Sequence, residues 1–235
     1  FYSLYLPESQ ETRASILILH GMQEHSGRYK AVAEYFANQG FAVLTYDHIG
    51  HGKTAQSREE LGYFQAHKPD KQLVSDTKLM AEQLENLYPN LPKYIMGHSM
   101  GSFITRVFLQ ENYQDFDGAI IVGTGAKVPG IGFFKTYLAV KNTFNPKKRS
   151  SFVNRTFSNM NNKKFKNQAG ADATSWLSAN PENRAAFEKD STLGVPFTNN
   201  GFYTLIKINQ KATKRNWAKK IDKDFPMLFV SGAED

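Results

Sequence analysis

Short apolar runs alternate with longer amphipathic stretches along the first half of the chain. Four runs have the length and composition of strands that are buried on both faces, at residues 15–19, 41–46, 93–96 and 119–122. Three stretches between them place apolar residues at helical spacing, at residues 28–38, 73–87 and 100–110. The alternation predicts an α/β fold in which a mainly parallel sheet is flanked by helices.

The alternation stops between residues 125 and 204, and another strand-like run follows at 227–230. Segments inserted above the carboxyl ends of parallel strands are well placed to bind substrate. The interruption therefore predicts a cap, or lid, inserted into the fold. We expect three segments, which are the first part of the core at 1–124, the cap at 125–204 and the second part of the core at 205–235.

Composition is that of a globular protein. The chain has 235 residues, 40% of them hydrophobic, which fits one α/β domain with an insertion or two small domains. No run approaches the roughly 18 apolar residues of a membrane span, and the N-terminal FYSLYLPESQ lacks the basic start and apolar block of a signal peptide. The chain begins at Phe1, which leaves a removed targeting segment or a trimmed terminus open. The absence of cysteine favours a cytoplasmic location.

The net charge of +7 is unevenly spread. Residues 127–166 contain no acidic residue but ten basic ones, namely Lys127, Lys135, Lys141, Lys147, Lys148, Arg149, Arg155, Lys163, Lys164 and Lys166. Aromatic residues alternate with them, namely Phe133, Phe134, Tyr137, Phe144, Phe152, Phe157 and Phe165. Such a segment can contact anionic lipid headgroups or bind nucleic acid. No nucleic-acid-binding module is recognisable, so we expect peripheral contact with an anionic membrane, or else a solvated lysine-rich surface over core aromatics.

A nucleophilic serine is indicated by the sequence GHSMG. Gly97-x-Ser99-x-Gly101 has the spacing of a nucleophile elbow, in which a serine sits on a sharp turn between a strand and a helix. The motif follows the apolar run 93–96 and opens the stretch 100–110. Small residues at 97 and 101 would permit the tight turn and the close approach of helix to strand. This context predicts an elbow rather than a plain strand-to-helix turn.

A second motif, His20-Gly21-Met22, follows the first apolar run. Serine hydrolases of this fold place one oxyanion-hole N–H in the loop after that strand, and take the other from the residue after the nucleophile. We therefore expect the backbone N–H groups of Met22 and Met100 to form the oxyanion hole. His20 is expected to be structural, with its ring bonded to nearby backbone.

Three motifs together identify a family resemblance. LHGMQEHSGRY, YDHIGHGKT and GHSMG, in this order, resemble the monoacylglycerol lipase and lysophospholipase group of serine α/β-hydrolases. The resemblance covers most of residues 14–123, resumes at 231–235 and is weak in the cap. It implies an α/β-hydrolase fold and hydrolysis of a single-chain lipid ester, through an acyl-enzyme on Ser99, in a hydrophobic tunnel under the cap. It implies no metal or organic cofactor. It also places Glu24 and Arg28 near the polar end of the substrate, with a local salt bridge as the alternative.

The remaining triad members are only partly present. This fold supplies its triad in the order Ser, then Asp or Glu, then His, so an acid is expected after a late strand. Asp235 follows the run 227–230, and the resemblance places the acid there too, whereas Asp222 and Asp224 precede the strand and Glu234 would point elsewhere. All six histidines precede Ser99, namely His20, His25, His48, His51, His67 and His98.

The histidine base is therefore expected beyond residue 235, after one more helix and strand, and we expect the C-terminal part of the fold to be missing from this chain. The main alternative is a non-catalytic lipid-binding protein on the same fold. A hydrolase of other small esters or of peptides is also open.

Overall fold

The computed structural model describes residues 1–8, 11–127, 130–165, 167 and 171–233. Its strands are β1 (Tyr2–Tyr5), β2 (Ala14–Leu19), β3 (Phe41–Tyr46), β4 (Lys93–His98), β5 (Gly118–Val122) and β6 (Met227–Val230). Its helices are α1 (Lys30–Ala37), α2 (Pro69–Leu87), α3 (Met100–Asn112), α4 (Ile131–Phe144), α5 (Ser151–Asn162), α6 (Pro181–Lys189) and α7 (Asn199–Ala212). Two short 3-10 helices, η1 (Ser26–Tyr29) and η2 (Tyr113–Asp115), complete the described elements.

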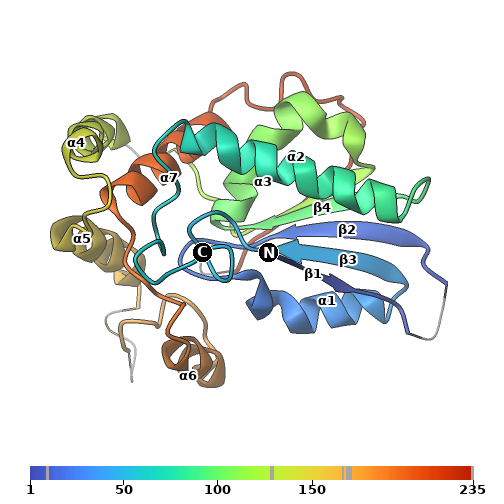
Figure 1. Ribbon diagram of the computed structural model, residues 1–235, viewed down its shortest axis with the longest axis horizontal. Coiled ribbons are helices and arrows are strands. Elements are labelled where there is room, and N and C mark those ends of the chain that lie inside the picture. The colour runs from blue at the N-terminus through green and yellow to red at the C-terminus, as the bar shows by residue number, and fades with distance from the viewer. Residues whose placement is uncertain (9–10, 128–129, 166, 168–170, 234–235) are drawn as a thin grey trace.

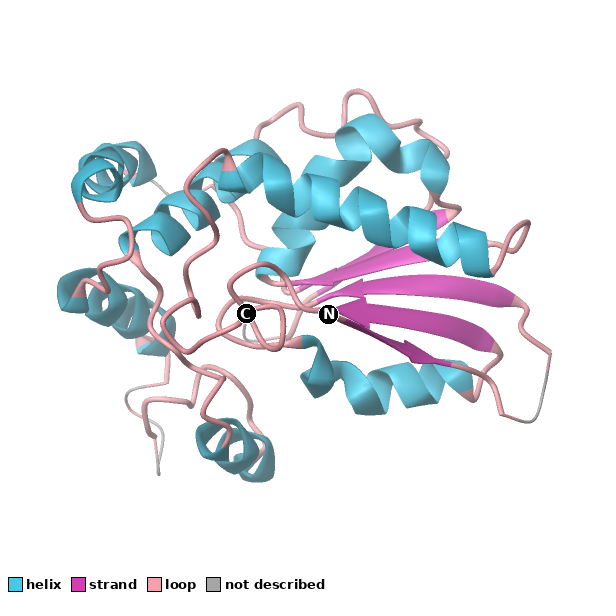
Figure 2. Ribbon diagram, in the orientation of Figure 1, coloured by secondary structure: helices cyan, strands magenta, loops and turns pink. Residues whose placement is uncertain are grey.

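The described strands form one sheet in the order β1-β3-β2-β4-β5-β6, and all neighbours are parallel except β1 and β3 (Figure 2). This confirms the predicted mainly parallel sheet. In the register of the sheet, Leu19 pairs with Gly97, and His98 pairs with Val122. The carboxyl ends of β2, β4 and β5 therefore lie side by side, which brings together the loops that begin at His20, Ser99 and Gly123.

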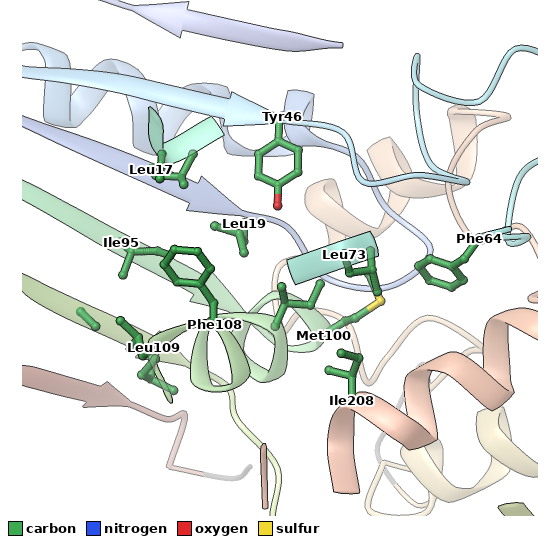
Figure 3. Close-up of a cluster of buried hydrophobic side chains, with 14 of the residues drawn as sticks. Leu17, Leu19, Tyr46, Phe64, Leu73, Ile95, Met100, Phe108, Leu109 and Ile208 are labelled. Carbon is green, nitrogen blue, oxygen red and sulfur yellow. The ribbon is translucent and has the colours of Figure 1, made fainter. Parts of the chain in front are cut away.

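Helices cover both faces of the sheet. In Figure 1, α2 and α3 lie on one face and α1 lies on the other. Leu17, Leu19 and Ile95 of the strands belong to one hydrophobic cluster with Phe108 and Leu109 of α3, and all five side chains are fully buried (Figure 3). A second cluster forms against α1 on the opposite face, around Ile16, Ile18, Tyr29, Ala33 and Val43. Both faces of the central strands are thus apolar, as expected for strands between two helical layers.

Strand β1 was not predicted. It is the antiparallel edge strand, with Tyr2 exposed and Ser3, Leu4 and Tyr5 only partly buried. Its four residues lack the continuous apolar run that marked the central strands, because an edge strand packs on one side only. The N-terminal part of α2 was also missed, since the helix begins at Pro69, where proline suits the first turn.

The predicted cap consists of helices and loops in its described part, and it lies beyond the carboxyl ends of the strands (Figure 1). It contains α4, α5 and α6, together with the first residues of α7. The predicted boundary between 204 and 205 falls inside α7, which continues without interruption from Asn199 to Ala212.

Helix α7 is held on the core by a buried acid. The Lys211 Nζ donates to Asp70 Oδ2 at 2.7 Å, and Lys207 Nζ donates to the other carboxylate oxygen. Burial raises the pKa of Asp70, but the hydrogen bonds from the two lysines outweigh this and lower it below its usual value. Since α7 also packs against α3 and α4, it connects cap and core.

In the described ranges, no helix combines the length and the hydrophobicity that crossing a bilayer requires.

Candidate active site

Ser99 occupies a strained turn between β4 and α3. Its φ of 50° and ψ of −116° are rare for a residue with a side chain, and such strain is characteristic of a nucleophile elbow. A Cβ built on Gly97 would overlap Thr105 and the Gly101 backbone, and one built on Gly101 would overlap the Leu19 carbonyl. Only glycine fits at these two positions. The geometry is that of the elbow predicted from GHSMG.

Hydrogen bonds to the Ser99 backbone fix the turn. The Ser99 N–H donates to the Val122 carbonyl at 3.0 Å, and the Ser99 carbonyl accepts from the Ser102 N–H at 3.0 Å and also from the Ser102 hydroxyl. Ser102 Oγ lies 2.9 Å from Thr124 Oγ1, which accepts from Arg106 Nη1 at 3.1 Å. The elbow is thus tied to the loop after β5. Sequence reasoning missed this network, because Thr124 lies 22 residues from Ser102 and 18 from Arg106, so the three form no local motif.

Two backbone N–H groups beside Ser99 have no hydrogen-bond acceptor among the described residues. These are the amides of Met22 and Met100, and both residues line the same cavity as Ser99. The neighbouring Gly21 N–H is already occupied, because it donates to Glu24 Oε1 at 2.6 Å. A Cβ on Gly21 would lie 3.3 Å from the Ser99 Cβ, so this loop passes directly over the serine.

The loop after β2 is supported by three buried histidines. The His20 ring donates from Nδ1 to the Gly21 carbonyl at 2.7 Å and accepts the His48 N–H at Nε2, 3.0 Å away. His48 Nε2 bonds the His20 carbonyl, and His51 Nδ1 bonds the Ile49 carbonyl. Burial lowers the pKa of all three rings, that of His51 to about 3. The rings are therefore neutral, and His20 bonds the nearby backbone as the sequence predicted.

Glu24 is enclosed behind this loop rather than in the cavity. Its carboxylate accepts from Gly21 N–H, from the Tyr29 hydroxyl at 2.7 Å and from Arg28 Nη1, and it lies 3.3 Å from His98 Nδ1. Burial raises its pKa, but hydrogen bonding to His98 and the charges of His98 and Arg28 outweigh this and lower it to about 2. Of the two alternatives that the sequence left open, this geometry corresponds to the local salt bridge between Glu24 and Arg28.

The described histidines do not supply a base to the serine. Within the described part of the chain, no hydrogen bond reaches Ser99 Oγ. His98 faces Tyr29, with its Nδ1 2.8 Å from the phenol oxygen, and His25 bonds Asp190. Asp235, the predicted acid, lies outside the described residues, as does Glu234. No three His, Asp or Glu side chains in the described ranges converge as a metal site.

A cavity of about 550 Å³ opens beside Ser99. Its walls come from the cap helices α4 and α5, from α7 and from α3, and the apolar side chains among them include Phe103, Ile131, Phe134, Phe157, Leu205 and Ile206. The hydroxyl and carboxamide side chains in the described lining are Ser99, Thr156, Asn161 and Asn209, and no charged side chain is among the lining residues described. The serine therefore borders a largely apolar chamber.

Comparisons with known proteins find sequences of lipases that are similar to this chain. The chain is 31% identical over 121 residues to a monoglyceride lipase homolog of monkeypox virus, an alignment that covers 52% of this chain and 42% of that protein. It is 30% identical over 129 residues to a monoacylglycerol lipase of Mycolicibacterium smegmatis, which covers 55% of this chain and 38% of that protein. The matched stretch thus spans about two fifths of the length of these curated relatives.

The fold is that of the α/β-hydrolases. A crystal structure of a thermostable carboxyl esterase from Bacillus coagulans, in complex with glycerol, superposes with a TM-score of 0.84 at 24% identity, over 96% of this chain and 73% of that chain. The model of the family described as serine aminopeptidase, S33, matches residues 10–235, from the loop before β2 through the elbow and the cap to the end of the chain. Because this match covers far more than half of the sequence, the chain belongs to the serine aminopeptidase S33 family of α/β-hydrolases.

Proposed function

We propose that the protein is a serine hydrolase that cleaves carboxylic esters of single-chain lipids, such as monoacylglycerols or lysophospholipids. The observation that carries the proposal is the position of Ser99, on a strained elbow that borders a largely apolar cavity. An acyl chain would occupy the cavity while its ester carbonyl lies at the serine. The similarity to relatives named monoglyceride lipase supports the same substrate class.

The chemistry follows from the groups around the serine. Ser99 Oγ would attack the ester carbonyl carbon, and the free amides of Met22 and Met100 would stabilise the negative charge that develops on the carbonyl oxygen. The C–O bond to the alcohol then breaks, the alcohol leaves with a proton, and water later hydrolyses the acyl-enzyme. We assign Asp235 as the acid that orients a histidine base. That base is proposed to come from outside residues 1–235, because Ser99 Oγ has no bond to any of the described histidines.

An ester is favoured over a peptide with a free amino terminus. An aminopeptidase must bind the ammonium group of its substrate, for which a carboxylate is the usual partner. The described lining of the cavity contains no Asp or Glu, and the carboxylate of the nearby Glu24 is engaged by Arg28, Tyr29 and the Gly21 amide.

The test is active-site labelling of the intact natural protein with a fluorophosphonate, combined with hydrolysis of a monoacylglycerol. We expect labelling at Ser99, and Ser99→Ala should abolish both labelling and hydrolysis. Ser151→Ala, an exposed cap serine at the start of α5, is the matched control and should retain both. If Ser99→Ala still hydrolysed the ester at the wild-type rate, the proposal would be wrong. If the wild-type protein bound the lipid without hydrolysing it, the non-catalytic alternative would replace it.

We further propose that the cap contacts anionic membranes. Its outer surface exposes Phe133 (85%), Phe144 (77%) and Phe152 (63%), while Tyr137 and Phe152 link α4 to α5 by an edge-on ring contact. The same segment of the chain carries exposed lysines, including Lys141, Lys147, Lys148 and Lys163. These three aromatics are exposed, whereas Phe134, Tyr137 and Phe157 of the same segment pack against the core. Aromatic rings can insert at the lipid interface while lysines contact the headgroups.

Vesicle sedimentation tests this contact. The protein should bind vesicles that contain phosphatidylserine better than neutral vesicles, and salt should weaken the binding, because exposed charges are screened beyond roughly 10 Å at 0.1 M salt. Replacing Phe133, Phe144 and Phe152 by serine should reduce binding. Tyr35→Ser, which alters a ring on α1 that is about as exposed as Phe152, should not. Equal binding to both vesicle types would refute the proposal.

A further inference from the structure

A segment of the cap contacts the loop that carries Met22. We name residues 187–194, at the end of α6 and in the turn after it, the latch segment, and residues 20–28 the oxyanion loop. His25 Nε2 lies 3.0 Å from Asp190 Oδ2, and the Gly194 N–H donates to the Gln23 carbonyl at 2.9 Å. The Arg28 guanidinium lies over the Phe187 ring, 5.2 Å from its centroid. The three contacts are of different kinds and are spread along both segments.

The hydrogen bond between His25 and Asp190 has a defined direction. His25 Nδ1 accepts the Gly27 N–H at 3.1 Å, which caps η1, so the ring proton is on Nε2. The Nε2–H therefore donates to Asp190 Oδ2. The other oxygen, Oδ1, accepts from the N–H and the hydroxyl of Thr192 and shapes the latch segment itself. Asp190 thus uses one oxygen for its own turn and the other for the oxyanion loop.

The contacts act where the oxyanion loop is under strain. Gln23 has a φ of 56°, which is unfavourable for a residue with a side chain, and it directly follows Met22. Strained residues of this kind persist only where surrounding contacts hold them. The Gly194 N–H bonds the carbonyl of Gln23 itself, and Asp190 bonds the ring two residues later.

We infer that the latch segment holds the oxyanion loop in the conformation that presents the Met22 amide to the serine, with Asp190 as a positioning residue. The inference rests on the proposed function, since it takes the Met22 amide as an oxyanion donor. It goes further because it gives the cap a second role. The cap helps to position an oxyanion donor in addition to forming a wall of the substrate cavity. Displacement of the latch segment would then lower the rate of ester cleavage without blocking substrate binding.

The chain offers a matched pair of substitutions. Asp190→Asn keeps Oδ1 and the Thr192 turn, but it places an amide N–H group against the Nε2–H of His25, so that two donors meet. Asp172 occurs in a similar Asp-x-Thr turn, in which its Oδ1 accepts from the N–H and the hydroxyl of Thr174, and no bond joins it to the oxyanion loop among the described residues. Asp172→Asn is therefore the control for a general effect of a changed carboxylate in the cap.

Hydrogen–deuterium exchange of the intact protein tests the contact without reference to catalysis. Asp190→Asn should speed the exchange of amides in residues 20–28, and Asp172→Asn should not. The melting temperature should change little in either variant, because partly exposed pairs such as His25 and Asp190 contribute little to global stability. Equal exchange of the oxyanion loop in both variants would overturn the inference.

Ester kinetics test the positioning role. Asp190→Asn should lower kcat by about 10-fold, less than the 10²- to 10³-fold loss of a whole oxyanion donor, with KM unchanged. His25→Ala should lower kcat similarly, and the double variant should be no worse than His25→Ala alone, since the two residues act through each other. Faster exchange with an unchanged kcat would overturn the positioning role. An absence of Ser99-dependent hydrolysis in the wild type would instead refute the proposed function, and the exchange experiment would still decide whether the latch holds the loop.

Discussion

At the scale of single residues, the two glycines of the elbow have no room for a side chain. A Cβ on Gly101 would overlap the Leu19 carbonyl, which belongs to the neighbouring strand and is fixed by the sheet. Gly101→Ala should therefore destabilise the fold or displace α3 from β2. Urea unfolding should show a loss of at least about 1–3 kcal/mol, the usual cost of overpacking a well-packed site.

Gly132 provides the opposite case. It lies within α4, and a Cβ built on it meets nothing within 4 Å. Gly132→Ala should raise the free energy of unfolding by about 0.5–1 kcal/mol, because alanine loses less backbone entropy in a helix. If both alanine variants changed stability in the same direction, the close approach of Gly101 to Leu19 would not be the cause.

Two asparagines of α7 differ in how well they are bonded. Asn209 is buried beside the cavity, and its Oδ1 has no hydrogen-bond partner among the described residues. Asn200 Oδ1 accepts the Phe64 N–H at 3.1 Å, and its Nδ2 donates to the Gln65 carbonyl at 2.9 Å.

Leucine at the two positions should consequently have opposite effects. Asn209→Leu should stabilise the protein by up to about 1 kcal/mol, since it removes an unpaired buried oxygen, whereas Asn200→Leu should cost about 1–3 kcal/mol, since it leaves two backbone groups unpaired. The midpoints of urea unfolding measure both effects. A loss of stability in Asn209→Leu would mean that its amide is satisfied in solution.

At the scale of elements, the walls of the cavity make a prediction about substrate length. Leu205 lies on α7 and lines the chamber that α4 and α5 enclose. Leu205→Trp should fill part of this space and should lower kcat/KM for long-chain esters relative to acetate esters by about 10-fold or more, as steric changes in apolar pockets do. Leu79→Trp, on the exposed face of α2, is the matched control. An unchanged ratio in Leu205→Trp would place the acyl chain elsewhere.

Most elements of the core could be predicted from local sequence alone. The central strands appear as short apolar runs, and the helices as apolar residues at helical spacing. The runs at 41–46 and 227–230 coincide with β3 and β6, and 93–96 lies within β4. The elbow was predictable because its glycines and serine are close in sequence. The cavity was expected only from the family resemblance, since its walls combine Phe103 of α3 with side chains of α4, α5 and α7.

The interactions that organise the site could not be predicted, because they join residues that are far apart in the sequence. His25 and Asp190 are 165 residues apart, and Lys211 and Asp70 are 141 residues apart. A charge pattern shows that such groups exist but not which of them meet. Residues 199–204 were assigned to the cap because the alternation of strands and helices is interrupted up to residue 204. That interruption does not show that one helix continues across the predicted boundary.

At the scale of the whole molecule, buried titratable groups make the stability of the fold dependent on pH. The pKa of His51 is about 3 in the fold against an ordinary 6.5, so its ring stays neutral while the unfolded chain takes up a proton. The contribution of the neutral His51 ring to the free energy of unfolding is fully present above pH 6.5. It is lost as the pH falls toward 3, at about 1.4 kcal/mol per pH unit. The pKa values of His20 and His48 are also lowered, so their effects have the same sign. Glu24, with its pKa lowered from 4.5 to about 2, adds a further loss between those two values.

Urea unfolding at several pH values between 7.5 and 5 tests this directly. The free energy of unfolding should fall steadily below pH 6.5. His51→Gln should flatten the slope, even though it lowers stability at neutral pH, whereas His67→Gln, which alters an exposed loop residue, should leave the slope unchanged. A free energy independent of pH over this range would show that the three buried rings are protonated without penalty.

The continuous path of α7 also determines how the cap can be exchanged between related proteins. A chimera joined at residue 204 would take residues 199–204 of the helix from one parent, and Lys207 and Lys211 from the other. A recombination point before Asn199 would instead move the whole helix with the core, together with its two bonds to Asp70. Cap transplants that leave this helix intact should yield folded hybrids, whereas a junction at 204 would separate Phe202 from the other cavity-lining residues of the helix and from the lysines that bind Asp70.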